Sequence, residues 1–231
     1  MNNNNLCIIP ARGGSKRIPK KNIKIFQGKP IISYPIQIAL ETKIFNEVMV
    51  STDDKEIGEI SKKYGASVPF YRSKSNSDDH SILNDVTKEV ITEYAKKGLT
   101  FDNVCCILPT ACLIQHEDLK KGLELLQKNE YYSIRPVLRF KSPIQRSFRM
   151  NKKGELNMIN PNNYKSRSQD LEETYHDSGQ FYWFKSSSGL NSNQKIGFEI
   201  SHLNAQDIDD EEDWKLAEMK FKFSNSQINK I

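Results

Sequence analysis

Residues 9–22 of the chain, IPARGGSKRIPKKN, combine two adjacent glycines with five cationic side chains. Glycine carries no Cβ, so the backbone N–H groups around Gly13 and Gly14 can approach an anion closely. Arginine can clamp a phosphate with two parallel hydrogen bonds, whereas lysine offers a movable point charge. The cations are Arg12, Lys16, Arg17, Lys20 and Lys21. This pattern predicts a site for the triphosphate of a nucleotide.

Two common phosphate-binding patterns do not occur in this segment. The P-loop spacing G-x-x-x-x-G-K-[ST] is absent, and no third glycine completes the G-x-G-x-x-G spacing of a dinucleotide fingerprint. A basic surface loop is the alternative interpretation, but a solvated loop does not need two glycines directly behind an apolar run. Basic clusters also occur in nucleic-acid-binding modules and on proteins that meet anionic membranes.

A second group of candidate residues is acidic and lies in DIDDEEDW at 207–214. Asp207 and Asp209 are two residues apart, so in an extended segment their carboxylates point to the same side. Such oxygen ligands suit Mg²⁺, which keeps waters and substrate phosphates as its other ligands. The acids at 210–213 fit the first turn of a helix, where the helix dipole favours negative charge.

The elements that must position these residues are predicted from hydrophobic periodicity. Predicted strands cover residues 6–10, 47–51, 67–70, 104–108, 179–184 and 196–200. Predicted helices cover 31–40, the segment between a capping box at Asp53 and Gly65, the stripe from 82 to 98, 117–128 and 211–221. This alternation predicts an α/β fold, with a mostly parallel, Rossmann-like sheet and helices on both faces. Ligands of such sheets collect beyond the carboxyl ends of the strands, where the glycine loop begins.

Residues 139–174 interrupt the alternation of strands and helices. They are polar, rich in Arg, Lys, Asn and Ser, and contain no predicted buried element. A segment of this length without its own core is usually a functional excursion or an interaction arm. We therefore expect one domain spanning 1–231, from which 139–174 protrudes, and a frayed tail over the last eight residues.

Composition bears on the compartment in which the protein is expected and on membrane association. The 231 residues carry a formal net charge of +5, and 37% of them are hydrophobic. The four cysteines lack the paired spacing of a zinc site and mostly lie in or beside apolar runs, which favours a reducing environment. The start of the chain lacks the pattern of a signal peptide, and no stretch approaches the roughly 18 apolar residues of a membrane span. We expect a cytoplasmic protein without membrane contact.

The glycine loop and the paired acids together resemble the signature of the CMP-sialic acid synthetase family, with its relatives for other nonulosonic acids and Kdo. The resemblance runs from about residue 6 to 214 and includes GKPIISYPI at 28–36 and VSTDD at 50–54. It implies a nucleotidyltransferase sheet, Mg²⁺ as cofactor, and a homodimer in which 139–174 serves dimerisation and reaches the partner's acceptor site. The implied reaction transfers CMP from CTP to the anomeric hydroxyl of an acidic nine-carbon sugar and releases pyrophosphate.

The resemblance also implies roles for individual residues. Arg12 and Lys21 match the triphosphate-binding cations, and they form the catalytic set with Asp209. Asp207 and Asp209 match the metal ligands. Arg72 stands where an arginine reads the cytosine, although Ser73 follows it in place of the family's common proline. The implied nucleotide-binding residues are Ala11, Arg12, Gly13, Gly14, Ser15, Lys21, Asn22, Arg72 and Ser81. Ser81 fits the cap of the following helix equally well.

Two departures from the sialic acid pattern concern the acceptor sugar. LPTACLI at 108–114 lacks the Gln and the Ser-Pro of L-Q-P-T-S-P, which leaves Thr110 to keep part of that role. YHDSGQFYWF at 175–184 replaces an N-G-A-I-Y-type strand and resembles the pseudaminic acid branch. Pseudaminic acid is therefore the expected acceptor, with legionaminic and N-acetylneuraminic acid as alternatives.

Further acceptor contacts follow from the same segment. Arg167 suits the sugar carboxylate, while His176 and Gln180 suit hydroxyl or N-acyl groups. An aromatic core strand at 181–184 is the structural alternative. Two functions of other classes remain open: a nucleic-acid-binding module, which leaves Asp207 and Asp209 unexplained, and a nucleotide-sugar-binding protein without turnover. We expect CTP and the sugar as partners, and no nucleic acid.

Overall fold

The computed structural model describes residues 4–77, 82–128 and 131–228. Its main sheet has the strand order β11-β6-β10-β5-β1-β4, and β9 pairs with β6. The strands are β1 (Asn5–Pro10), β4 (Glu47–Ser51), β5 (Asn103–Ile107), β6 (Ser133–Arg139), β9 (Tyr175–Asp177), β10 (Phe181–Lys185) and β11 (Lys195–Glu199). The pairings make β4, β1, β5, β6 and β11 run in one direction, while β9 and β10 run against them. The prediction of a mostly parallel α/β sheet is confirmed.

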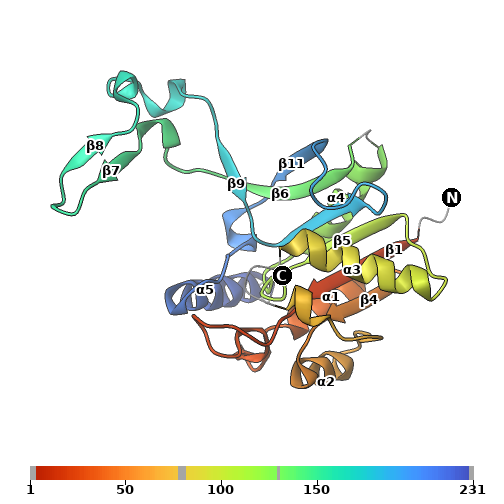
Figure 1. The fold of residues 1–231 in the computed structure, drawn as a ribbon. Helices are drawn as coiled ribbons and strands as arrows, with labels where there is room; N and C mark the ends of the chain where they lie inside the picture. Colours follow the sequence, from red (N-terminus) through yellow and green to blue (C-terminus); the bar gives the residue numbers. More distant parts are fainter. Residues whose placement is uncertain (1–3, 78–81, 129–130, 229–231) are drawn as a thin grey trace.

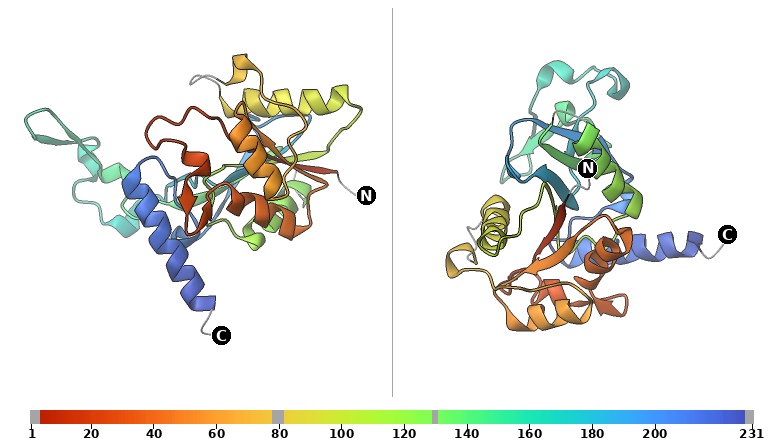
Figure 2. Two further views of the ribbon diagram at one scale, coloured as in Figure 1. Left: turned by 90° about the horizontal axis from the view of Figure 1, so that it is seen from below. Right: turned by 90° about the vertical axis from the view of Figure 1, so that its right-hand side faces the viewer.

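Helices cover both faces of this sheet, as Figure 1 and Figure 2 show. The α-helices of the described residues are α1 (Ser33–Thr42), α2 (Lys55–Lys63), α3 (Leu83–Lys96), α4 (His116–Lys128) and α5 (Glu211–Ile228). Val90 and Tyr94 of α3 pack with Leu6 and Ile8 on one face. Side chains of α1, α2 and α4 join a second core cluster with Cys7 on the opposite face. Strands that are buried on both faces of a sheet have continuous apolar sequences, which is why β1 and β5 could be predicted from sequence.

The remaining elements of the described residues are short. They are the strand pair β2 (Ile25–Phe26) and β3 (Lys29–Pro30), and the 3-10 helices η1 (Lys21–Ile23), η2 (Lys74–Asn76), η3 (Ile144–Arg146), η4 (Pro161–Asn163), η5 (Ser168–Asp170) and η6 (His202–Asn204). Residues 140–174 protrude from the body of the molecule. They include the exposed hairpin of β7 (Phe148–Met150) and β8 (Leu156–Met158).

Several elements differ from the prediction. Residues 67–70 form no strand, because only Ser67 bridges to Met49. The cap of α2 is Asp54 and not Asp53: Asp54 accepts hydrogen bonds from the N–H groups of residues 56 and 57. Strand β6 was not predicted, because arginines and a proline interrupt its apolar pattern. Helix α5 continues to residue 228, through most of the segment predicted to be a frayed tail.

The four cysteines are free and buried. Burial raises the pKa of each thiol, so they behave as small apolar side chains. Among the described residues, no helix combines the length and the apolar composition that crossing a membrane requires.

Candidate active site

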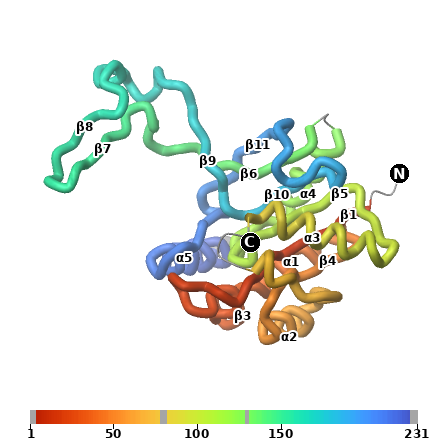
Figure 3. The backbone as a smooth tube through the Cα atoms, viewed as in Figure 1, coloured from red at the N-terminus to blue at the C-terminus, as the bar shows by residue number. Residues whose placement is uncertain are grey.

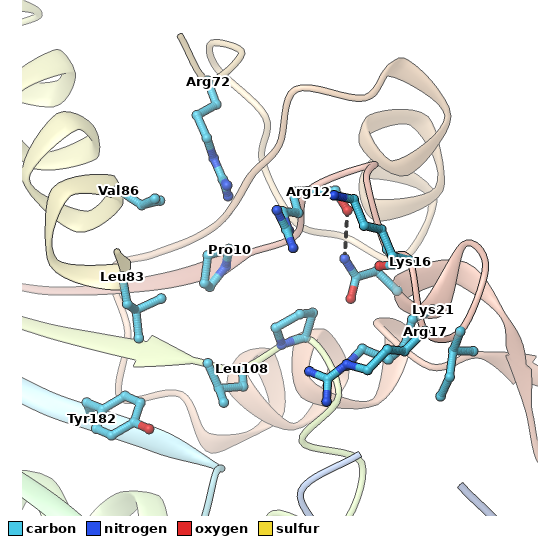
Figure 4. Close-up of a pocket in the computed structure, with 14 residues that line it drawn as sticks. Pro10, Arg12, Lys16, Arg17, Lys21, Arg72, Leu83, Val86, Leu108 and Tyr182 are labelled. Atoms are coloured by element: carbon cyan, nitrogen blue, oxygen red, sulfur yellow. Dashed lines mark hydrogen bonds between the residues drawn. The ribbon is translucent and has the colours of Figure 1, made fainter. Parts of the chain in front are cut away.

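A cavity of about 400 Å³ opens where β1 and β5 end, in the region where ligands of open α/β sheets bind (Figure 4). Pro10 and Leu108 form part of its floor, and Leu83 and Val86 of α3 form an apolar wall. Its cationic lining consists of Arg12, Lys16, Arg17, Lys21 and Arg72. A cavity of this size is typical of small-molecule sites, and its charge suits a polyanion.

The glycine loop is tied to the start of α2. The N–H of Gly13 donates to Asp53 Oδ1 at 3.0 Å. A Cβ at position 13 would lie 2.8 Å from Asp54 Oδ2, so the close approach of loop and helix requires glycine there. At Gly14, apart from its chain neighbours, no atom of the described residues lies within 4 Å of a Cβ position, which leaves this side of the loop open to a ligand. Ala11 is buried, and its N–H donates to the Ser51 carbonyl at 2.9 Å.

The second half of the loop presents Lys21 and Asn22. Lys20 adopts a left-handed backbone conformation with φ 52°, and its Nζ lies 2.6 Å from Glu56 Oε2. Asn22 is buried and donates from Nδ2 to the Arg12 carbonyl at 2.9 Å, which fixes the loop across its base. Arg12, Ser15, Lys21 and Asn22 all line the cavity.

Lys21 meets the acidic segment although the two are far apart in sequence. Its Nζ donates to the Ile208 carbonyl at 2.6 Å and lies 4.0 Å from Asp209 Oδ1. Burial lowers the pKa of Lys21, and the carboxylates of Asp209 and Asp207 partly offset this effect. Arg17 reaches the same segment, since its Nη2 lies 2.7 Å from Asp209 Oδ1.

Asp207 is held against the turn that precedes β10. A Cβ at Gly179 would lie 3.1 Å from both Cβ and Cγ of Asp207, and Gly179 has φ +65°, so glycine permits this approach. Burial, and then the neighbouring charge of Asp209, raises the pKa of Asp207. The carboxylate is therefore costly to ionise without a cation nearby.

The acids that follow form the cap of α5. Asp210 Oδ1 accepts hydrogen bonds from the N–H groups of Glu212 at 2.9 Å and Asp213 at 3.0 Å. Asp213 Oδ2 in turn accepts from the Asp209 N–H at 2.9 Å. The carboxylates of Asp207 and Asp209 take no part in this cap.

Arg72 enters the cavity from the side opposite Lys21 (Figure 4). Its guanidinium donates from Nη2 to the Ser51 carbonyl at 2.6 Å and from Nε to Ser51 Oγ at 3.2 Å. Burial lowers the pKa of Arg72, and the charge of Asp53 partly restores it. Arg72 is thus fixed at the end of β4. Ser81, the other predicted base contact, lies outside the described residues.

The four predicted acceptor residues do not converge in one chain. Thr110 is buried in the turn after β5 and is not part of the cavity lining. Arg167 lies on the protruding segment and pairs with Asp170 at 2.7 Å. His176 lies on β9, where its Nδ1 is 2.9 Å from the Asp177 carbonyl oxygen. Gln180 is buried beside the end of β5, and neither of its amide atoms has a hydrogen-bond partner in the part of the chain that the structure describes.

Sequence reasoning missed Tyr182, which lines the cavity. Its hydroxyl donates to Asp177 Oδ1 at 3.0 Å, and burial, with the nearby Asp177 charge, raises the pKa of the phenol. Strand alternation was the available signal, since Phe181 and Trp183 point to the other face of β10 and pack there. Asp53 was missed as the anchor of Gly13, because a cap at either aspartate fits the sequence pattern.

The carboxylates of Asp207 and Asp209 suit a divalent cation that binds together with the substrate phosphates. Within residues 4–77, 82–128 and 131–228, no group of three or more His, Cys, Asp or Glu side chains could hold a metal by itself. Mg²⁺ is commonly bound by one or two carboxylates together with substrate phosphates and waters. Asp207 and Asp209 supply two such carboxylates beside the cationic cavity, and a bound cation would offset the burial and the Asp209 charge that raise the pKa of Asp207.

The chain is similar to known proteins in both sequence and fold. A family model described as cytidylyltransferase matches residues 6–215. A pseudaminic acid cytidylyltransferase of Campylobacter jejuni is 41% identical over 226 residues, which cover 96% of this chain and 97% of that protein. A CMP-N,N'-diacetyllegionaminic acid synthase of Legionella pneumophila is 36% identical over 120 residues, 52% of each chain. The solved structure of a CMP:2-keto-3-deoxy-manno-octonic acid synthetase shares the fold with a TM-score of 0.68, at 17% identity, covering 96% of this chain and 99% of that one.

Proposed function

The chain belongs to the cytidylyltransferase family, and we propose that it transfers CMP from CTP to the anomeric hydroxyl of pseudaminic acid, releasing pyrophosphate. The observation that best supports CMP transfer is the contact of Lys21 with the Asp207–Asp209 segment beside one cation-lined cavity. The choice of acceptor is supported by the Campylobacter jejuni relative, which is named for pseudaminic acid and matches nearly the whole of this chain.

In this proposal the nucleotide lies across the carboxyl ends of β1 and β5. The glycine loop, with Arg12 and Lys21, binds the triphosphate, and Asn22 holds the loop in shape. The cytosine lies toward Arg72 and the apolar wall of Leu83 and Val86. The reaction demands little covalent chemistry from the protein, so positioning and neutralisation of charge supply most of the rate enhancement.

Asp207 and Asp209 would hold Mg²⁺, which when bound supplies a Lewis acid that neutralises phosphate oxygens. Lys21 is fixed by its hydrogen bond to the Ile208 carbonyl, so its charge is already placed where the α-phosphate is displaced. The apolar wall excludes water from the base-binding side of the cavity. These residues act on charge and orientation, and a general base is not part of the proposal.

The acceptor is tested by turnover of CTP with a panel of sugars. Pseudaminic, legionaminic and N-acetylneuraminic acid are supplied in turn, and the CMP conjugate is detected by mass. We expect pseudaminic acid to be converted far better than N-acetylneuraminic acid. Equal or better conversion of N-acetylneuraminic or legionaminic acid would replace the acceptor while leaving CMP transfer intact, and binding of CTP without pyrophosphate release would overturn catalysis itself.

We also propose a homodimer that uses the protruding segment. Its apolar side chains are exposed to an extent that a solvated hairpin does not explain: Phe148 54%, Met150 72%, Leu156 60%, Ile159 52% and Tyr164 71%. Arg167 is not among the residues that line the cavity of its own chain, so we assign its role at the acceptor to the protruding segment of a second copy. The free cysteines support a cytoplasmic location.

Light scattering at assay concentration tests the dimer. We expect twice the chain mass for the wild-type protein and a monomer for the double variant Met150→Glu, Leu156→Glu. A fully active wild-type monomer would exclude the dimer.

A further inference from the structure

Unpaired polar atoms gather at one place beside the cavity. Among the described residues, seven buried side-chain nitrogen or oxygen atoms have no hydrogen-bond partner, and four of the seven belong to Arg135, Ser178 and Gln180. An unpaired buried polar group costs about 1–3 kcal/mol. Such groups are rare in folded proteins, so several of them close together call for a ligand.

Arg135 is only partly satisfied by its neighbours. Within the described residues, the hydrogen bond found for its guanidinium is a long one, 3.4 Å from Nη1 to Asp177 Oδ2. The Nε is buried and has no partner. The guanidinium carbon lies 5.2 Å from the centre of the Tyr182 ring, which holds the group in place by a cation–π contact. Its side chain is 25% exposed, so a solute can reach it.

Asp177 does not neutralise this arginine by tight pairing. Its Oδ1 already accepts hydrogen bonds from the Tyr182 hydroxyl at 3.0 Å and from the Gly179 N–H at 2.9 Å. These bonds orient Tyr182 and the 177–179 turn. The guanidinium therefore keeps most of its five donors for another oxygen-rich group.

The place of Arg135 in the sheet fits the second substrate. The strand order runs β6-β10-β5-β1, and Figure 3 shows β10 between β6 and β5. Tyr182 on β10 lines the nucleotide cavity, and Arg135 on β6 lies beyond it, away from the glycine loop. The neighbouring turn touches Asp207, since Gly179 closely approaches that side chain. The unpaired atoms thus belong to a region that adjoins both the nucleotide cavity and the proposed metal ligands.

We propose that Arg135 binds the carboxylate of the acceptor sugar. The inference rests on the proposed function. A guanidinium binds a carboxylate through two parallel hydrogen bonds, and the Nη groups of this partly exposed side chain supply the fork. In a nonulosonic acid the carboxylate and the anomeric hydroxyl are attached to the same carbon. Fixing the carboxylate therefore also fixes the oxygen that attacks the α-phosphate.

Steady-state kinetics of Arg135→Gln and Arg135→Lys test this assignment. With CTP saturating, we expect the KM for the sugar to rise about 10–100-fold in Arg135→Gln, the range for losing a charge-assisted hydrogen-bonded pair, and less in Arg135→Lys. The Kd for CTP, measured by calorimetry, should change less than about twofold. The matched control is Arg139→Gln on the same strand, whose two terminal nitrogens already pair with Glu173 and Glu199, although its Nε is unpaired among the described residues; its sugar KM should stay near the wild-type value.

A sugar analogue in which a carboxamide replaces the carboxylate separates recognition from folding. The wild-type protein should prefer the acid strongly, and Arg135→Gln should lose that preference, because its partner group is gone. An equal loss toward acid and carboxamide would overturn the assignment. A rise in the sugar KM in Arg167→Gln but not in Arg135→Gln would also overturn it and place the carboxylate at Arg167. If the wild-type protein makes no CMP-sugar at all, the proposed function fails, a result distinct from an unchanged KM in an active Arg135 variant.

Discussion

Arg17 and Asp209 form an ion pair of 2.7 Å between Nη2 and Oδ1 that joins the glycine loop to the segment before α5. Both side chains are well exposed, at 67% and 47%, and exposed pairs contribute only about 0–1 kcal/mol. The pair can therefore exchange at little cost when a phosphate reaches Arg17 and a cation reaches Asp209. Together with the Lys21 hydrogen bond to Ile208, it brings the two halves of the site together before substrate binds.

Replacement of Lys21 by alanine should lower turnover much more than CTP binding. The charge of Lys21 is needed most while the α-phosphate is displaced, so its loss acts on the transition state. We expect kcat to fall about 10²–10³-fold, as when one preorganised donor is removed. Steady-state kinetics and calorimetric CTP binding measure the two effects separately.

Lys24→Ala is the control for that experiment. Lys24 pairs with Glu211 at 2.6 Å and is not among the residues that line the cavity. Its variant should keep kcat within a fewfold. A Lys21→Ala variant with unchanged kcat and a raised KM for CTP would show that Lys21 serves binding alone.

Replacement of Arg72 should act mainly on nucleotide binding. The guanidinium is fixed by two hydrogen bonds to Ser51, so it offers donors to the base at a defined place. We expect Arg72→Ala to weaken CTP binding about 10–100-fold, the range for losing charge-assisted hydrogen bonds, and to lower the preference for CTP over UTP. Competition binding with both nucleotides checks this. Loss of affinity for both nucleotides by the same factor would contradict a role in reading the base.

The stability of the loop after Arg72 should depend on pH through Glu89. Burial alone would raise the pKa of Glu89, but hydrogen bonds from Asn76 and from Ser73 hold it below its ordinary value. A lowered pKa means that the ionised form stabilises the folded state. This contribution is present above the unfolded value of about 4.3 and is lost as pH falls through the lower folded value.

Glu89→Gln should therefore melt slightly below wild type at pH 7, because solvent screens this partly exposed group and keeps its contribution small. The difference should shrink as the pH falls below about 4, where both proteins carry a neutral group. Glu93→Gln on the same helix is the control, since Glu93 pairs with Lys96, whose side chain is 65% exposed. A difference that is the same at pH 3 and pH 7 would show that charge is not involved.

The central strands were predictable because helices bury them on both faces. The apolar runs at 6–10 and 104–108 have no polar interruption that would obscure them. Strand β6 was not predictable in this way: Arg135, Pro136 and Arg139 disrupt its pattern, and its identity as a strand comes from pairing with β10 on one side and β11 on the other. Such pairing depends on residues distant in sequence, and local periodicity does not contain it.

The same limit applies to the site. The glycine loop and the paired acids are contiguous motifs, so the sequence indicated both of them and the chemistry of each. The contact between these two motifs could not be predicted from local sequence, since Lys21 and Ile208 are 187 residues apart. Arg135 and Asp177 come together through the register of β6 with β9, where Val137 lies opposite Asp177. Residues within a contiguous motif can be assigned roles from a resemblance to known motifs. Residues that meet only in the folded chain can be assigned roles only from the structure.

Replacement of either metal-binding candidate should make turnover depend more steeply on Mg²⁺. Asp207→Asn and Asp209→Asn keep the shape of the side chain and remove one charge, so the fold should survive. The α5 cap uses Asp210 and Asp213 and stays intact in both variants. We expect activity to fall by orders of magnitude at limiting Mg²⁺ and to recover partly at high Mg²⁺, because a weakened site still fills by mass action. Glu212→Gln, in the exposed first turn of α5, is the control and should follow the wild-type curve. If the control loses as much as the two variants, or if all three keep the wild-type dependence on Mg²⁺, the cation is held elsewhere.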